Sequence, residues 1–308
     1  MIARSDRAPD TGRFEGQSAP AGAIALRKDR TLNFFQLMPA NIDPTSLVAI
    51  LLILGVSGLM SGLSGFGFSA VGALSLWLLP PKLGVPLLMT LSTANQLMSL
   101  GQLKADMRPL KEWWPDGPGP YLLGGVVGVP IGLYILQSLP TPTLMLVFGA
   151  FLVGYAAYSM LKPESVKISL AGWKPSVLVG LTGGVIGGFT AFPGAAVVVW
   201  TGLHRMAKHE ARSIVQPYIL GLQVISLAML AVQHPQTFNP TFWALLAVTV
   251  PVVLPGTLLG VRLYKNLSDI NFRRIAFMML GVSGFGLLMK AASALSMFAV
   301  ITKAAHHG

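Results

Sequence analysis

The sequence predicts an all-α, polytopic membrane protein. Of its 308 residues, 53% are hydrophobic and only 11% are charged, whereas soluble domains have about 25% charged residues. Apolar runs long enough to cross a bilayer as a helix, which takes about 20 residues, recur from Thr45 onward. A soluble protein of this composition would expose more apolar surface than water tolerates.

The N-terminal stretch, residues 1–44, is polar and stands apart from the membrane part. It interleaves arginines with acidic residues and lacks the apolar core of a signal peptide. We expect a disordered tail with a short interfacial helix around Leu32–Leu37. Met38 directly precedes the first membrane segment, which makes it a candidate start of the native chain.

About eight membrane segments follow in order along the chain. They are residues 46–79, 83–104, 119–137, 142–161, 175–203, 210–232, 240–262 and 272–300. The first and fifth are too long for one simple crossing, and both contain glycine clusters. We group the segments into a first repeat, 45–161, and a second repeat, 175–302. A charged linker loop, 162–174, joins the repeats, and residues 303–308 form a tail.

Recurring residues in the same order indicate that the two repeats are homologous. Gly58, Gly62 and Gly65 recur 122 residues later as Gly180, Gly184 and Gly187. Further recurrences are Gln96 and Ser99 as Gln223 and Ser226, and Gly128 and Gly132 as Gly256 and Gly260. Such internal duplication is a common plan of secondary transporters.

Loop charge predicts the orientation of the repeats. Loops 104–118, 162–174, 203–212 and 262–274 each contain at least three lysines or arginines, whereas 138–141 and 233–239 contain none. If all eight segments crossed, the basic loops would be divided between the two faces, against the positive-inside rule. If 46–79 and 175–203 enter and return on one side, all four basic loops are cytoplasmic. We therefore predict inverted repeats, each with one broken or re-entrant glycine-rich helix.

Charge also limits the substrate. Every acidic residue lies in the tail, in a loop or at a segment end, whereas pumps and cation carriers usually bury a carboxylate. This pattern favours an anion over a cation. The formal charge of +11 lies mostly in short loops, so it sets orientation and does not indicate a nucleic-acid partner. With no cysteine there is no thiolate site, and no metal or cofactor is indicated.

Two glycine-rich stretches, 62–69 and 183–194, are the strongest candidate site. Glycine lets the chain leave helical geometry, and Pro193 removes a donor and disrupts the preceding turn. A broken helix exposes N–H groups at the start of its second half, which bind anions together with the helix dipole. Glycines four residues apart also allow membrane helices to pack closely, so packing and binding both remain open.

Polar residues near these stretches complete the candidate site. Amides around Gly65–Gly67 and Gly187–Gly188 would hold the anionic head, with help from nearby hydroxyl and amide side chains. The predicted substrate-binding residues are Ser64, Gly65, Gly67, Gln96, Gly187, Gly188, Thr190, Arg212 and Gln223. For the two glutamines the alternative is hydrogen bonding between helices, and for Arg212 it is an interfacial anchor.

An enzyme is the less favoured class. The sequence Gly55-Val-Ser57-Gly58 resembles the serine motif of rhomboid intramembrane proteases, but all five histidines lie near loops or in the tail. There is no H-E-x-x-H motif and no phosphate loop. A serine hydrolase using Ser57 therefore stands only as an alternative, beside a carrier of another carboxylate or oxyanion.

The glycine-rich segments resemble the TauE/SafE sulfite exporter family. The resemblance covers roughly residues 46–290 and rests on Gly58–Pro80, on Gly180–Gly194 with the following Val197–Trp200, and on Arg212. It implies a secondary transporter, an exporter, of small sulfur-containing anions such as sulfite, sulfonates or thiosulfate. The implied location is the inner (cytoplasmic) membrane of a bacterium, with a small anion and the lipid bilayer as partners and a homo-oligomer left open. Bulky Phe66, Phe68 and Phe192 depart from the family pattern and would narrow the site or suit an organic tail.

Overall fold

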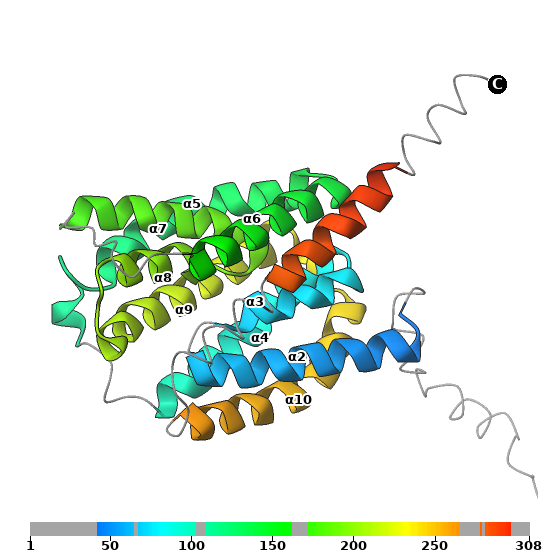
Figure 1. Ribbon diagram of the computed structural model, residues 1–308, viewed down its shortest axis with the longest axis horizontal. Coiled ribbons are helices and arrows are strands. Elements are labelled where there is room, and N and C mark those ends of the chain that lie inside the picture. Colours follow the sequence, from blue (N-terminus) through cyan, green and yellow to red (C-terminus); the bar gives the residue numbers. More distant parts are fainter. Residues whose placement is uncertain are drawn as a thin grey trace, which may run out of the picture. The chain divides into compact units, whose positions relative to one another are not determined.

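The computed structural model of the chain describes residues 42–64, 67–102, 109–161, 172–264, 278 and 281–296, and within these ranges it contains helices and no strands (Figure 1). The helices belong to one compact unit, Met38–Gly308. They are α2 (Pro44–Ser64), α3 (Phe68–Gly72), η2 (Ala73–Trp77), α4 (Pro81–Gln102), η4 (Leu110–Glu112), α5 (Gly119–Ser138), α6 (Thr141–Leu161), α7 (Trp173–Thr190), α8 (Gly194–Leu203), α9 (Lys208–Gln233), η5 (Pro235–Phe238) and α10 (Pro240–Tyr264). A further helix covers residues 281–296. The predicted tail up to residue 41, the candidate start Met38, linker residues 162–171 and the tail 303–308 lie outside the described residues.

Five of the described helices are long and apolar enough to cross a membrane, namely α2, α5, α6, α9 and α10. Large apolar side chains such as Leu52 and Leu123 are exposed on them, as expected for surfaces that face lipid. The prediction of a polytopic helical membrane protein is confirmed. Helix α4 coincides with the predicted segment 83–104 but is not one of the five, because Ser92, Asn95 and Gln96 make it more polar. The count of eight segments stays a prediction.

The two overlong segments are interrupted helices. Segment 46–79 consists of α2 followed by α3 and the 3-10 helix η2, and segment 175–203 consists of α7 followed by α8. Asp43 caps the start of α2, since the Ser46 N–H donates to its carboxylate at 3.1 Å. Hydrogen bonds from the side chain and the backbone of Ser46 lower the pKa of Asp43. After η2 the chain reaches the start of α4, where the Lys82 ammonium donates to the carbonyl of Gln137 at 2.7 Å. The start of α4 therefore lies beside the end of α5.

Helices α2 and α10 pack with their backbones in contact. A Cβ atom added at Gly58 would overlap the carbonyl oxygen of Val253, and one at Gly62 would overlap that of Thr257. The contacts advance in the same direction along both helices, so the pair is parallel. Gly260 provides the reciprocal contact, because its Cβ would overlap the carbonyl oxygen of Leu59.

Helices α5 and α7 form a second parallel pair, side by side at the opposite edge of the view in Figure 1. Cβ atoms at Gly124 and Gly128 would overlap the carbonyl oxygens of Val177 and Leu181, and one at Gly184 would overlap that of Gly125. Glycines are required at these positions because no side chain fits between the two backbones. In both pairs, a helix of the first predicted repeat packs on a helix of the second.

We expect the variant Gly184→Ala to lose stability. Overpacking a close interface costs about 1–3 kcal/mol, and the added methyl group would meet backbone atoms of Gly125, which have little room to move. The measurement is thermal unfolding of the detergent-solubilised protein. Gly154→Ala is the matched control, since a Cβ there meets nothing within 4 Å. Equal midpoints for the two variants would contradict the packing role of Gly184.

Candidate functional site

The first helix break lies between α2 and α3, within the predicted stretch 62–69. Ser64 is the last residue of α2, and Gly67 precedes α3 with φ −76° and ψ −1°. Any residue adopts these angles, so the backbone at this position does not require glycine. Gly65, predicted to hold the anion, and Phe66 lie outside the described residues.

The second break lies between α7 and α8. Ala191 ends α7 in the left-handed conformation, with φ 60° and ψ 18°, and its N–H donates to the carbonyl of Gly187. Such an end is common for helices, although glycine usually occupies it. Pro193 then precedes Gly194, the first residue of α8, and provides no side-chain cap. The first turn of α8 therefore has amides that no capping side chain satisfies.

The structure places the predicted site residues Gly187, Gly188 and Thr190 inside α7, before the break. The break falls after Thr190, so the amides of both glycines lie inside α7, in its 4-residue hydrogen-bonding pattern. Their small size serves packing, because Cβ atoms there would lie 2.8 Å from the Cα atoms of Pro193 and Gly132, respectively. The Thr190 hydroxyl is buried and donates to the carbonyl of Ile186 at 2.7 Å. Its single hydrogen is thus already used within the helix.

The two breaks meet at the carbonyl oxygen of Ala191. The Ser69 hydroxyl, from α3, donates a buried hydrogen bond to this oxygen. The side-chain amide of Gln223, from α9, donates to it at 3.4 Å. Gln223 was predicted to belong to the site, and the structure places it directly at the second break, whereas Ser69 was not in the predicted set.

Asn95 adds an oriented amide from α4. The Thr257 hydroxyl donates to Oδ1 of Asn95 over 2.6 Å, a distance typical of O–H···O and short for N–H···O hydrogen bonds. The same hydroxyl also lies 3.1 Å from the carbonyl oxygen of Val253 in α10. With Oδ1 in the contact with Thr257, Nδ2 is the remaining donor of the Asn95 side chain. Nδ2 is buried and has no hydrogen-bond partner among the described residues. A site that binds an anion needs donors of this kind.

Polar residues form a stripe along one face of α9. At 3.6 residues per turn, Arg212, Gln216 and Gln223 lie within a narrow arc of the helix. Gln216 is 2% exposed, and its Nε2, like Oε1 of Gln223, has no hydrogen-bond partner in the described part of the chain. Arg212 is half-buried and lies about 16 Å from Gln223 along the axis, at about 1.5 Å per residue. The structure therefore does not bring Arg212 to the breaks.

Gln96 lies on the helix that faces this stripe. It is 1% exposed, and α4 packs against α9, α10 and α3. Asn95 and Gln216 are buried amides that were not in the predicted set. The signal that could have included them is general: an amide side chain in the middle of a membrane helix seeks a polar partner.

The other chemistry considered from the sequence finds little support. Ser57 is fully buried, and its hydroxyl donates to the carbonyl of Ile53 at 2.7 Å within α2. Within the described ranges, no three histidine, cysteine or acidic side chains gather in a way that could hold a metal ion.

Comparison with known proteins identifies the family. The profile of the sulfite exporter TauE/SafE family matches residues 48–287, which covers both helix breaks and all five membrane-capable helices except the first residues of α2. Comparisons with curated proteins and with solved structures each gave no significant match. The matched region is most of the chain, and the protein is therefore a multi-pass membrane protein that belongs to the TauE/SafE sulfite exporter family, a family of transporters.

Proposed function

We propose that the protein is a secondary transporter that exports a small sulfur-containing anion, sulfite or a sulfonate, across the inner membrane. The anion binds where the two helix breaks meet. The observation that carries this proposal is the shared acceptor at Ala191, which ties Ser69 of α3 and Gln223 of α9 to the second break. Irregular backbone within a membrane persists only where it is buried in protein or lines a cavity.

The helices α4 and α9, which pack against each other, contain buried donors that suit an anion. Asn95 and Gln216 each have a buried side-chain nitrogen without a hydrogen-bond partner among the described residues, and burying such a group costs free energy until a partner arrives. Oε1 of Gln223 is a buried acceptor that likewise has no hydrogen-bond partner among the described residues. An oxyanion that retains one proton satisfies donors and acceptor together. Neutral amides also release an anion more readily than a buried cation would.

The stripe on α9 gives the anion a route. It begins near the basic residues His204, Arg205 and Arg212 and descends to Gln223. Clustered positive charge raises the local concentration of anions. An anion that leaves a negative interior gains about 2.3 kcal/mol per charge per 100 mV. Export can therefore proceed without ATP and without a coupled ion.

The proposed scaffold is a pair of inverted repeats with eight membrane segments. The helix pairing supports this scaffold, because the first helix of each repeat pairs with a helix of the other repeat: α2 pairs with α10, and α7 pairs with α5. Ser69 and Ala191 are 122 residues apart, the offset that also relates the glycine clusters. Equivalent residues that touch lie on the symmetry axis of a duplicated fold. The binding site is therefore proposed to lie on that axis.

Cysteine labelling tests the orientation. Ser138 and Gln236 are exposed, and the chain has no native cysteine. We expect Ser138→Cys and Gln236→Cys both to react with a membrane-impermeant maleimide from the periplasmic side only. A cysteine at Arg205, which is exposed in a basic loop, is the control that should react only from the cytoplasmic side. Labelling of the first two from the cytoplasm would refute the inverted arrangement.

Flux in proteoliposomes tests the substrate. Sulfite and small sulfonates should move faster than carboxylates of equal size, and an inside-negative potential should accelerate their exit. Faster carboxylate flux would favour the alternative of a carboxylate carrier. Movement of none of these anions in either direction would refute the proposed function. Ser57→Ala should leave flux unchanged, and loss of a hydrolytic activity in that variant would favour the hydrolase alternative.

The Asn95–Thr257 pair provides a test within the site. Thr257→Val removes the hydroxyl that orients Asn95, and a lost hydrogen bond of this kind costs about 1 kcal/mol. We expect a roughly five- to tenfold weaker apparent affinity for sulfite in the flux assay, with recovery in Thr257→Ser. Thr249→Val is the matched control, because Thr249 is buried on the same helix and donates only to Leu245 and Leu246 carbonyls. Equal losses in both valine variants would remove Asn95 from the site.

A further inference from the structure

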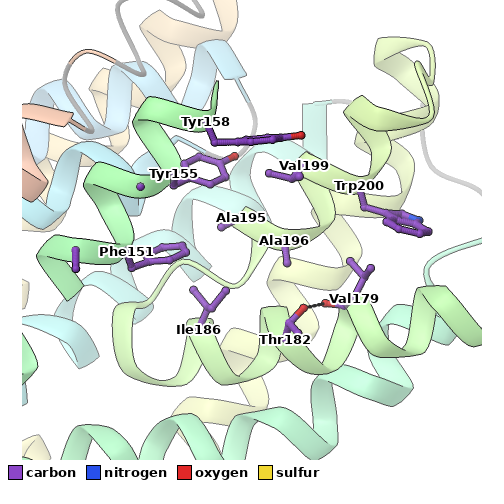
Figure 2. A pocket seen from close by; sticks show the side chains of 12 residues that line it. Phe151, Tyr155, Tyr158, Val179, Thr182, Ile186, Ala195, Ala196, Val199 and Trp200 are labelled. Carbon is purple, nitrogen blue, oxygen red and sulfur yellow. Dashed lines mark hydrogen bonds between the residues drawn. The ribbon is translucent and has the colours of Figure 1, made fainter. Parts of the chain in front are cut away.

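A groove of about 490 Å³ lies between α6, α7 and α8 (Figure 2). Its walls are apolar and aromatic, and the polar groups in it are few. The Thr182 hydroxyl is already donated to the carbonyl of Val179 at 2.8 Å. The groove is lined by Ala150, Phe151, Gly154, Tyr155, Tyr158, Val179, Thr182, Ile186, Ala195, Ala196, Val199 and Trp200.

The groove runs along the three helices from the second break to their outer ends. Its deep end includes Ile186, in the last turns of α7, and Ala195, in the first turn of α8. Its outer end includes Tyr158, near the end of α6, and Val179, nearer the start of α7. From Val179 to Ile186 the rise is about 10 Å at about 1.5 Å per residue.

The outer end of the groove has the features of a membrane interface. Trp173 lies 5.7 Å from Trp114 between ring centroids, and the Lys174 ammonium lies 5.9 Å from the Trp173 ring. At the end of α8, the Trp200 ring lies 4.6 Å from that of His204, and Arg205 follows, exposed. Val179, near the start of α7, and Trp200, near the end of α8, both line the groove, so the start of α7 and the end of α8 lie together. Aromatic and basic residues at helix ends mark the headgroup level.

We propose that this groove holds an acyl chain of an anionic phospholipid, whose phosphate lies by Lys174 and Arg205. The helices that form the groove belong to a multi-pass membrane protein, so an outward-facing apolar groove meets acyl chains. Lys174 is five residues before Val179 and Arg205 is five residues after Trp200, so both add complementary charge beyond this end of the groove. Basic pockets between membrane helices bind anionic headgroups. An inorganic oxyanion would lose its hydration against these walls without gaining donors.

The deep end of the groove connects this lipid to the second helix break. Ala195 and Ala196 form the first turn of α8, directly after the break. Tyr155, on the opposite wall, packs edge-on against Phe192 with ring centroids 5.7 Å apart. A chain in the groove therefore contacts both sides of the turn that contains Ala191. The bound lipid supports the position of α8 relative to α7.

Lipid binding to the purified full-length chain tests this proposal. The protein in detergent is titrated with dioleoyl phosphatidylglycerol or dioleoyl phosphatidylcholine, and retained lipid is counted by native mass spectrometry. We expect at least tenfold preferential retention of one phosphatidylglycerol. Gly154→Leu adds a large side chain to the lining of the groove at a position where a Cβ meets nothing within 4 Å, and should reduce this retention at least tenfold. Ala157→Leu, exposed on the same helix outside the groove, should retain wild-type binding.

A second variant separates the contribution of the lipid headgroup from that of the acyl chain. The double substitution Lys174→Gln and Arg205→Gln should abolish the preference for phosphatidylglycerol while the groove still accepts phosphatidylcholine. Thermal unfolding of each variant shows whether it is folded. The proposal would be overturned if the wild type retained both lipids equally. It would also be overturned if the wild type and Gly154→Leu retained phosphatidylglycerol equally. It would also be overturned if octanesulfonate bound in place of phosphatidylglycerol and lost affinity in Gly154→Leu, since the groove would then belong to the substrate.

Discussion

The carbonyl oxygen of Ala191 is the point on which the membrane part of this protein depends. A helix that ends inside a bilayer leaves carbonyl groups without partners, and no water is present to satisfy them. Here the carbonyl of Ala191, the residue that caps the end of α7, accepts from Ser69 and from Gln223. This one carbonyl group thereby connects the end of α7 to α3 and α9. The break in the second glycine-rich segment is stable because the first segment and the following helix supply its hydrogen bonds.

Backbone-to-backbone packing holds these breaks in position. The parallel pairs α2/α10 and α5/α7 have no side chains between them at the glycine contacts, so a small rotation of either helix would produce overlap. Tyr218 adds a further constraint, because its hydroxyl donates to the carbonyl of Gly180 at 2.6 Å. Helices α4 and α9, which contain the buried amides, pack against each other between these pairs and the hydrogen-bonded turn.

Much of this arrangement could be predicted from the sequence, because hydropathy and glycine clustering act locally. The two overlong segments are interrupted as expected, and Gln223 lies at the second break. The exact place of that break was missed: glycine tolerates an α-helix, so Gly187 and Gly188 stay helical, and Pro193 with the left-handed Ala191 ends it. The contacts of Ser69 and Asn95 could not be predicted for another reason. Their partners, Ala191 and Thr257, are 122 and 162 residues away, and no local pattern specifies such a contact.

The pairing of α2 with α10 also has a consequence for biosynthesis. Gly58 and Gly62 form a backbone groove on α2 that only α10 fills, and α10 begins at Pro240. When α2 leaves the ribosome and enters the membrane, its partner has yet to be synthesised. Similarly, α5 is synthesised before its partner α7. The α5/α7 pair can therefore form once residue 190 has been made, whereas the α2/α10 pair and with it the compact unit are completed only after α10 has been synthesised.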